Sequence, residues 1–338
     1  MSIFGWITLH EQCWRRGSGL ERPFSQHAQV TARGSSRRVQ RALTDFGADE
    51  AFAPAAAKFK EHYGVEVGVS RVRETTLRHA RHMAASQPAP VRTLPAQGPE
   101  VIIAEADGTM VPTVDTTAAP AGADRRKYRQ LRWQEARLVA AQAQGSATTH
   151  YGATLHGVEA TGELWENAVR AAGRGLQTAV HGVGDGASWI AEQCLRRFDP
   201  FVRYTLDLYH VCDYLAAAAL PSGPGVAQQR DLLRANRSAE VLAQLRPRLE
   251  PAEQPDELAP VRCAVRYLEN RPDQLDYAGA LARGLPVGSG LIESGHRHVL
   301  QKRIKLAGAW WTPDNVHALA QLRTCRANAR FDAYWANN

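Results

Sequence analysis

Apolar residues recur at helical spacing along residues 36–85. Val39, Leu43 and Phe46 would lie on one face of a helix, and Gly47 follows them as a stop signal. Two more segments of this kind come next, and both carry basic residues. The pattern predicts a small helical domain, which fits a DNA-binding helix-turn-helix and a plain helical bundle equally well.

A different pattern begins after residues 86–100, a stretch with four prolines that is typical of a linker. The next apolar run ends in Asp107 and Gly108, which predicts a strand followed by a turn, and a second short strand comes after it. The following apolar segment, around Trp133, fits a strand or a helix. Helices and strands then alternate, and with Trp133 in a strand the order is β, β, β, α, β, α, β. This order predicts an α/β core at 101–220 with parallel strand pairs.

Strand signals are lost after the core, where two long helical patterns with polar breaks follow. We therefore expect a helical insertion at 221–285. After the glycine-rich turn that ends at Gly290, one helix is predicted around Glu293 and a single further helix after Trp310. The segment 286–338 would thus supply C-terminal helices that complete the core.

Composition narrows the class of protein. The chain has 338 residues, of which 44% are hydrophobic and 22% charged, and no stretch approaches the roughly 18 consecutive apolar residues that span a membrane. The five cysteines are widely spread and include no CxxC pair, which excludes a disulfide scaffold and a zinc finger. The first residues lack the pattern of a signal peptide, so we expect a protein of the reducing cytoplasm.

The formal charge of +7 is concentrated towards the two ends of the chain. Residues 1–95 carry 14 Lys and Arg against 8 Asp and Glu, and residues 283–338 carry 8 against 3, whereas residues 96–282 carry 19 against 23. Basic regions attract polyanions, and nucleic acid is the commonest of these in the cytoplasm. The charge pattern alone fits a nucleic-acid partner or an ordinary solvated surface.

Three carboxylates occupy positions where an α/β sheet gathers functional groups. Asp107 and Asp185 come at the ends of predicted strands, and Glu293 lies in the helix after the insertion. The carboxyl ends of parallel strands meet at one edge of a sheet, and carboxylates brought together there suit Mg²⁺ or Mn²⁺. Each residue alone also fits a structural role, since Asp-Gly is a common turn pair and a helix glutamate is commonly solvated.

Several segments resemble those of a known family. The strings DGTMVP, GVGDGASWI, LDLYHVCDYLAAAA, GLPVGSGLIESGHRHVLQKRIKLAGAWW and RTCRANARFDAYW are similar to segments of bacterial insertion-sequence transposases of the ISKra group. The resemblance covers roughly residues 36–338 and is densest towards the C-terminal end. It implies a DDE transposase with a ribonuclease-H-like mixed sheet, in which Asp107, Asp185 and Glu293 are the first, second and third acids.

The resemblance also implies a chemistry and a set of partners. The three acids would bind two Mg²⁺ or Mn²⁺ ions for cleavage at the transposon ends and for strand transfer into target DNA. The partners would be double-stranded DNA, as element ends and as target, and further copies of the chain in a homo-oligomer on that DNA. Such a protein would be associated with the nucleoid of a bacterium, with no membrane and no nucleotide cofactor. The sequence agrees in lacking the GxxxxGK[ST] and GxGxxG motifs.

Residues 1–35 have a mixed character that the resemblance does not cover, and we expect them to belong to a truncated N-terminal region. This leaves an alternative open, namely a truncated or co-opted transposase that binds DNA ends without cutting them. A third hypothesis is a hydrolase unrelated to DNA, such as a glycosidase that uses two carboxylates as acid and base. The basic C-terminal segment argues against that hypothesis.

Other residues are expected to support the three acids. Asp207 and His210 match a D-x-x-H element of mutator-like transposases, in which His210 would orient a phosphate or the attacking water. A helix N-cap at Asp207 with a packed His210 explains the same residues equally well. Asp207 is also a rival for the second acid, but we prefer Asp185, because its flanking glycines leave room for a substrate.

A last group of residues is expected to contact DNA. Basic side chains would neutralise phosphates, and the paired tryptophans would either stack on an unpaired base or belong to the core. These residues follow Glu293 or lie in a second basic cluster, and they are Arg297, Lys302, Arg303, Lys305, Trp310, Trp311, Arg125 and Arg126.

Overall fold

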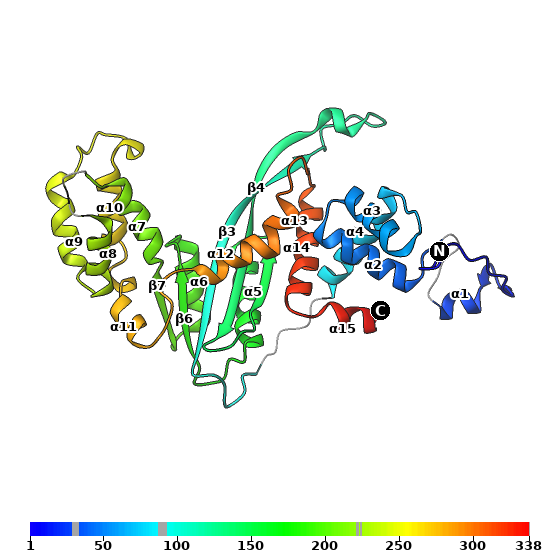
Figure 1. Cartoon of the computed structure of the whole chain (residues 1–338), viewed down its shortest axis with the longest axis horizontal. Helices are drawn as coiled ribbons and strands as arrows, with labels where there is room; N and C mark the ends of the chain where they lie inside the picture. Colours follow the sequence, from blue (N-terminus) through cyan, green and yellow to red (C-terminus); the bar gives the residue numbers. More distant parts are fainter. Residues whose placement is uncertain (29–33, 87–92, 221–222, 224, 338) are drawn as a thin grey trace. The chain divides into compact units, whose positions relative to one another are not determined.

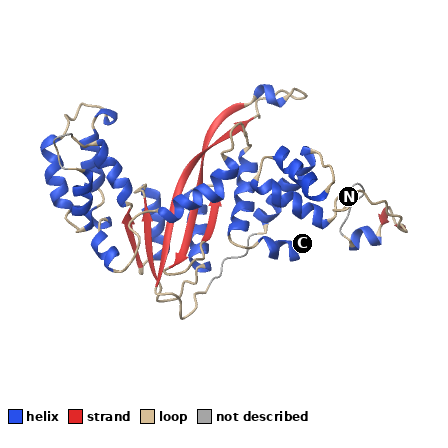
Figure 2. Cartoon of the chain, in the orientation of Figure 1, coloured by secondary structure: helices blue, strands red, loops and turns tan. Residues whose placement is uncertain are grey.

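The computed structural model describes residues 1–28, 34–86, 93–220, 223 and 225–337 of the chain. These residues form two units, each built from separate stretches of sequence. Figure 1 labels the elements, and Figure 2 separates helices from strands. Unit 1 consists of Met1–Pro88, Val111–Gln134 and Arg297–Asn338, and unit 2 consists of Ala89–Met110 and Glu135–His296.

A five-stranded mixed sheet makes this an α/β fold. The strands are β3 (Val101–Asp115), β4 (Gln130–Ala143), β5 (His150–Thr154), β6 (Ala179–Gly184) and β7 (Val202–Leu206). They lie side by side in the order β5-β4-β3-β6-β7 (Figure 2). β3 pairs in parallel with β6, and β6 with β7, whereas β4 and β5 are antiparallel. The fold therefore has the parallel pairs that the alternation of elements predicts.

Asp107 and Gly108 lie inside β3, so the predicted turn at this pair is wrong. The two short strands expected on either side of it are one strand, and the segment around Trp133 is the strand β4. Gly108 serves close packing instead of a turn, because a Cβ there would stand 2.0 Å from Oε1 of Glu135 on β4. The third strand of the sheet is β5, which the sequence pattern did not indicate.

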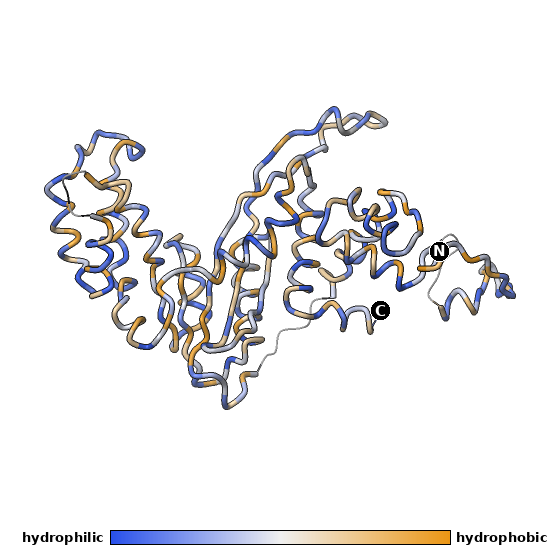
Figure 3. Tube along the Cα trace, viewed as in Figure 1, coloured by the Kyte–Doolittle hydropathy of each residue, from blue (hydrophilic) through white to orange (hydrophobic). Residues whose placement is uncertain are grey.

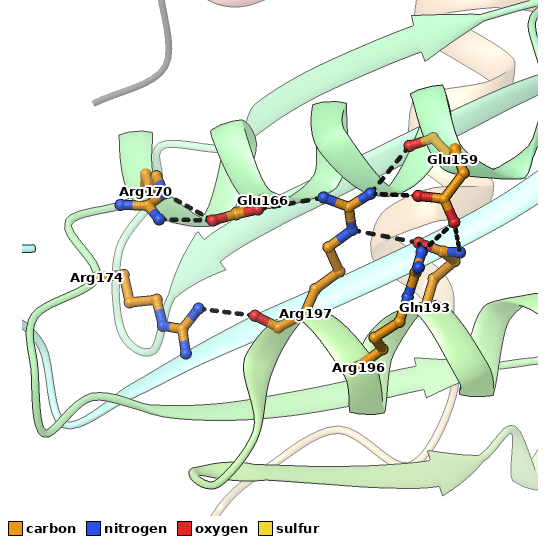
Figure 4. A network of polar contacts seen from close by, with 7 residues as sticks. All are labelled: Glu159, Glu166, Arg170, Arg174, Gln193, Arg196 and Arg197. Carbon is orange, nitrogen blue, oxygen red and sulfur yellow. Dashed lines mark hydrogen bonds and ion pairs between the residues drawn. The ribbon is translucent and has the colours of Figure 1, made fainter. Parts of the chain in front are cut away.

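Two helices, α5 (Val158–Ala171) and α6 (Ser188–Phe198), pack on one face of the sheet. Trp165 of α5 is fully buried there. Charged side chains also join the two helices to each other (Figure 4). Arg197 of α6 pairs with Glu159 at 2.9 Å and with Glu166 at 3.4 Å, and both glutamates lie on α5. The opposite face of the sheet can therefore pack against segments that come later in the chain.

After β7 the chain forms a helical insertion, which begins with the helix directly after β7 instead of at residue 221 as expected, and then returns to the sheet. The helices of the insertion enclose an apolar core that includes Leu206 of β7, and Figure 3 shows their hydrophobic and hydrophilic residues in alternation. The two ends of the insertion meet, because the N–H of Leu208 donates to the carbonyl of Val287 at 2.8 Å. The helices are α7 (Leu208–Ala217), α8 (Val226–Arg234), α9 (Ser238–Leu245), α10 (Pro260–Glu269) and α11 (Tyr277–Ala282), and α12 (Gly290–Gly295) follows.

Unit 1 consists mainly of helices. Its elements are β1 (Trp14–Arg16), β2 (Gly19–Glu21), α1 (Pro23–His27), α2 (Arg37–Asp49), α3 (Phe52–Tyr63), α4 (Val69–Ala85), α13 (Lys302–Ile304), α14 (Pro313–Ala327) and α15 (Phe331–Asn337). The helices α2, α3 and α4 lie where helical spacing was predicted, and α4 packs against α2, α3 and α14. The single helix expected after Trp310 is instead two helices, with Ala329 between them at a φ of 54°.

Gly47 does not end its helix, because α2 continues to Asp49. A Cβ at Gly47 would stand 2.1 Å from Oγ1 of Thr76 on α4. The residue that resembled a stop signal is therefore a point of close approach between two helices.

His79 of α4 belongs to a partly buried network that holds α15. Its Nδ1 lies 2.8 Å from the hydroxyl of Tyr334, and its Nε2 lies 2.9 Å from Oε1 of Gln40. Burial lowers the pKa of His79 from an ordinary value of 6.5 to about 4, and the charge of Arg78 acts in the same direction. His79 is therefore neutral in the folded chain at neutral pH.

We expect the free energy of unfolding to fall as the pH is lowered from about 6.5 to about 4. In this window the unfolded chain binds a proton at His79 that the folded chain does not, so protonation favours unfolding. Urea denaturation at pH 7 and at pH 5 measures the effect. His79→Gln removes the titrating group, so the variant should lose less stability over this interval. An equal loss in the variant and the wild type would contradict the prediction.

Candidate active site

Asp107 and Asp185 lie at the same level of two neighbouring parallel strands. In the pairing of β3 with β6, Glu105 lies opposite Val183. β6 ends at Gly184, and continuing this register by two residues would set Asp107 opposite Asp185. Neighbouring strands are roughly 4.8 Å apart, so the register brings the first two predicted acids close together.

Asp207 follows the end of β7, where Gly184 lies opposite Leu206, and its N–H donates to the carbonyl of Gly184 at 2.8 Å. We call Asp107, Asp185 and Asp207 the aspartate row. Asp207 is completely buried, whereas Asp185 is only partly buried. Of the two candidates for the second acid, Asp185 is therefore the more exposed.

The capping interpretation of Asp207 agrees with the structure. Its Oδ1 accepts hydrogen bonds from the N–H groups of Tyr209 at 2.7 Å and His210 at 3.2 Å, which makes Asp207 the N-cap of α7. His210 is exposed, so the packed histidine of that interpretation is wrong.

The side chain of Asp107 points away from α5 and α6. Ile102, Ala104 and Ala106 pack against those two helices. Because side chains alternate along a strand, Glu105 and Asp107 must face the other side of the sheet. That side is crossed by α12, the helix that carries Glu293 (Figure 1).

Two buried carboxylates fix the start of α12 to the sheet. Oε2 of Glu105 accepts a hydrogen bond from the N–H of Ile292 at 2.7 Å. Oδ2 of Asp207 accepts one from the N–H of Ser289 at 2.7 Å and another from the hydroxyl of the same serine. Glu293 comes directly after this anchored segment. The sequence analysis had not singled out Glu105 or Ser289, and only the fold reveals their role.

The other end of α12 packs closely on the sheet. A Cβ at Gly295 would stand 2.8 Å from the ring of Tyr151 and 3.0 Å from the side chain of Leu138. The absence of a side chain at Gly295 therefore allows the helix to pack closely against β4 and β5. Glu293 itself is exposed.

Glu105 is a buried carboxyl whose pKa is raised. Burial raises its pKa to about 8, the hydrogen bond from Ile292 opposes this shift, and the charges of Asp207 and Glu293 add to it. At neutral pH Glu105 therefore mostly carries a proton. A neutral carboxyl at this point limits the repulsion among the acids around it.

His296 is a further buried group at the site. It is 3% exposed, and its Nε2 lies 3.3 Å from Oδ2 of Asp107. Neither ring nitrogen has a hydrogen-bond partner within the described part of the chain. An imidazole in this position can hold or transfer a proton beside Asp107. The spacing of three residues from Glu293, which sets the two on one helix face, is the signal that could have identified it.

The loop that carries Asp185 is held by the insertion. The hydroxyl of Tyr267 donates to the carbonyl of Asp185 at 2.5 Å, and Nη2 of Arg271 donates to the carbonyl of Gly186 at 2.7 Å. Gly186 has a φ of 82°, a conformation that favours glycine. Tyr267 and Arg271 are therefore positioning residues that the sequence analysis missed.

The fit of a divalent cation is partial. Asp107 and Asp185 supply the carboxylate oxygens that Mg²⁺ and Mn²⁺ prefer, and the Asp107 side chain is 35% exposed. However, the described residues contain no group of three or more His, Cys, Asp or Glu side chains arranged to hold a metal ion. The fold thus places two of the predicted acids on or directly after neighbouring strands. The described residues form no metal-ligand group that includes Glu293.

The predicted DNA-binding residues belong to unit 1, and those that the structure describes differ in their exposure. Arg297, Lys302 and Lys305 are exposed. Arg303 is 1% exposed, and its Nε donates to the carbonyl of Gly47 at 2.9 Å. The prediction of a phosphate contact by Arg303 is therefore wrong, because the residue is committed to packing.

The remaining predicted contacts also differ from one another. Trp311 is a core residue, 7% exposed, whereas Trp310 is 44% exposed. Arg125 and Arg126 lie in a 3-10 turn at Arg125–Tyr128, and their side chains are outside the part of the chain that the structure describes.

Comparison with protein-family models finds no match to the chain, and comparison with curated proteins finds none either. Among the described residues, no helix combines the length and the hydrophobicity that a membrane span requires.

Proposed function

We propose that the chain is a DDE-type DNA transposase, which cuts DNA at transposon ends in a metal-dependent reaction and joins those ends to target DNA. The observation that carries this proposal is the parallel pairing of β3, which holds Asp107, with β6, after which Asp185 comes directly, beside the helix of Glu293. Three parallel strands beside an antiparallel pair support the finer proposal of a ribonuclease-H-like core.

Asp107, Asp185 and Glu293 are the residues that would hold two Mg²⁺ or Mn²⁺ ions. Bound ions of this kind activate an attacking oxygen and stabilise a leaving one in phosphodiester chemistry. The chain itself supplies the positioning, since Glu105 and Asp207 fix the backbone ahead of Glu293. His296 would contact Asp107 through its Nε2.

Double-stranded DNA is the proposed partner. The exposed side chains of Arg297, Lys302 and Lys305 would neutralise phosphates, so the affinity should fall steeply with salt. Two ends must be brought together for transposition, which leads us to propose a homo-oligomer on DNA, acting at the bacterial nucleoid.

A second candidate is a transposase-derived protein that binds DNA ends without cutting them. The observation in its favour is that no group of three metal-binding side chains is formed among the described residues. In this case Asp107 and Asp185 would be remnants of a site that no longer closes.

Cleavage of DNA taken from the flanks of the gene separates the two candidates. The purified full chain is incubated with labelled end DNA in Mg²⁺, Mn²⁺ or EDTA. We expect nicks at defined positions with either cation and none in EDTA. Salt-sensitive binding without nicking would support the second candidate instead. Neither binding nor nicking would contradict both.

A further inference from the structure

A cavity of about 400 Å³ lies within unit 1, beside the loop at 306–312. Its walls include the aromatic residues Phe52, Trp310 and Trp311 and the guanidinium groups of Arg73 and Arg303. None of the described residues that line it is acidic. The volume falls within the range of small-molecule sites, roughly 300–1,000 Å³. Such walls would suit a ligand in which a flat aromatic ring lies next to a negative charge.

One wall of this cavity is rigid. The indole N–H of Trp311 donates to the carbonyl of Ile304 at 3.1 Å, and the carbonyl of Trp311 accepts from the N–H of Val114 at 2.8 Å. The ring of Phe52 meets the Trp311 ring edge-on at 5.9 Å. The guanidinium of Arg303 lies 4.8 Å from the centres of both rings. The wall is therefore formed before any ligand arrives.

Two features of the cavity are not explained by packing. Trp310 leaves 44% of its surface exposed, although the guanidinium of Arg129 lies 5.4 Å from the centre of its ring. Nη2 of Arg303 is buried and has no hydrogen-bond partner within the described residues. Burial lowers the pKa of Arg303 to about 10, so the group is still cationic at neutral pH.

We propose that this cavity receives one unpaired nucleobase of DNA, an inference that rests on the proposed function and extends it. The base stacks on Trp310, and the guanidinium groups of Arg73 and Arg303 add positive charge to the walls around it. Arg73 and Arg129 neutralise the flanking phosphates. Stacking on an exposed aromatic ring beside cationic groups is the common way in which proteins hold single-stranded bases.

The test compares two DNA duplexes that differ in one base. One carries a single bulged thymine, and the other carries an abasic site at the same position. Dissociation constants are measured for the full chain in EDTA at fixed salt. We expect the bulged thymine to bind about 5- to 140-fold more tightly than the abasic bulge, the range of one base stack.

Matched variants locate this preference. Trp310→Ala should bind the two duplexes equally, and Trp310→Phe should keep part of the difference. Trp133 on β4 is 60% exposed and does not line the cavity, so Trp133→Ala should keep all of it. Thermal unfolding checks that the variants are folded.

Equal binding of the two duplexes by the wild type would overturn the inference. A preference that survives in Trp310→Ala, or is lost in Trp133→Ala, would overturn it as well. The measurement needs no cleavage. A chain that nicks transposon ends without preferring the bulged base loses this inference alone, and a chain with the preference but no nicking loses the transposase proposal alone.

Discussion

Replacing Asp207 with alanine is expected to lower the free energy of unfolding by about 3–7 kcal/mol. The side chain is completely buried and accepts hydrogen bonds from the N–H groups of Tyr209 and His210 and from the N–H and hydroxyl of Ser289. Loss of the helix cap costs about 1 kcal/mol. The two buried donors of Ser289 would also be left without a partner, at about 1–3 kcal/mol each.

Urea denaturation at pH 7 measures the effect of Asp207→Ala. Ser289→Ala is the matched control, because it removes the hydroxyl and leaves the backbone N–H paired with Asp207, so the loss should be smaller, about 1 kcal/mol. A loss below 1 kcal/mol in Asp207→Ala would show that these bonds contribute little. Hydrogen exchange of the amides at 286–293 gives an independent reading, and we expect it to accelerate in Asp207→Ala.

Asp107→Asn and Asp185→Asn are each expected to reduce metal-dependent cleavage by about a thousandfold. The charge stabilisation lost with a carboxylate ligand amounts to several kcal/mol, and each 1.36 kcal/mol is a factor of about ten in rate. The fold should be unchanged, because asparagine keeps the oxygen that accepts from the N–H of Gly108 or of Ala187.

The readout for these variants is the initial rate of nicking, with DNA affinity measured in parallel. Affinity should stay at the wild-type level, since the two acids make no phosphate contact. Asp213→Asn on α7 is a matched control at an exposed position and should keep full activity. Wild-type rates in either Asp107→Asn or Asp185→Asn would contradict the assignment of the acids.

The sequence predicts the α/β class because apolar periodicity changes clearly between helices and strands. It predicts Asp185 correctly as the residue after a strand, since Gly184 and Gly186 bracket it. It misplaces Asp107, because an Asp-Gly pair marks a turn more often than it marks close packing between strands. The short strand β5 was missed since its five residues show no alternation long enough to stand out.

The rest of the site depends on contacts between residues far apart in the chain. Glu105 resembles an ordinary strand glutamate until the N–H of Ile292, 187 residues later, is found bonded to it. Arg303 resembles its exposed neighbours Lys302 and Lys305, and only its bond to Gly47 reveals that it is buried. Local pattern carries no information on such pairs, because it reports periodicity and not partners.

The hydrogen bond between Leu208 and Val287 has a consequence for how this architecture can change. The insertion begins and ends at one point, so its length does not affect the geometry of the sheet. Closing a longer loop costs little additional free energy. A different domain could therefore be grafted between these residues, by evolution or by an engineer. Such a graft would have to replace Tyr267 and Arg271, the two side chains by which the present insertion steadies the loop of Asp185.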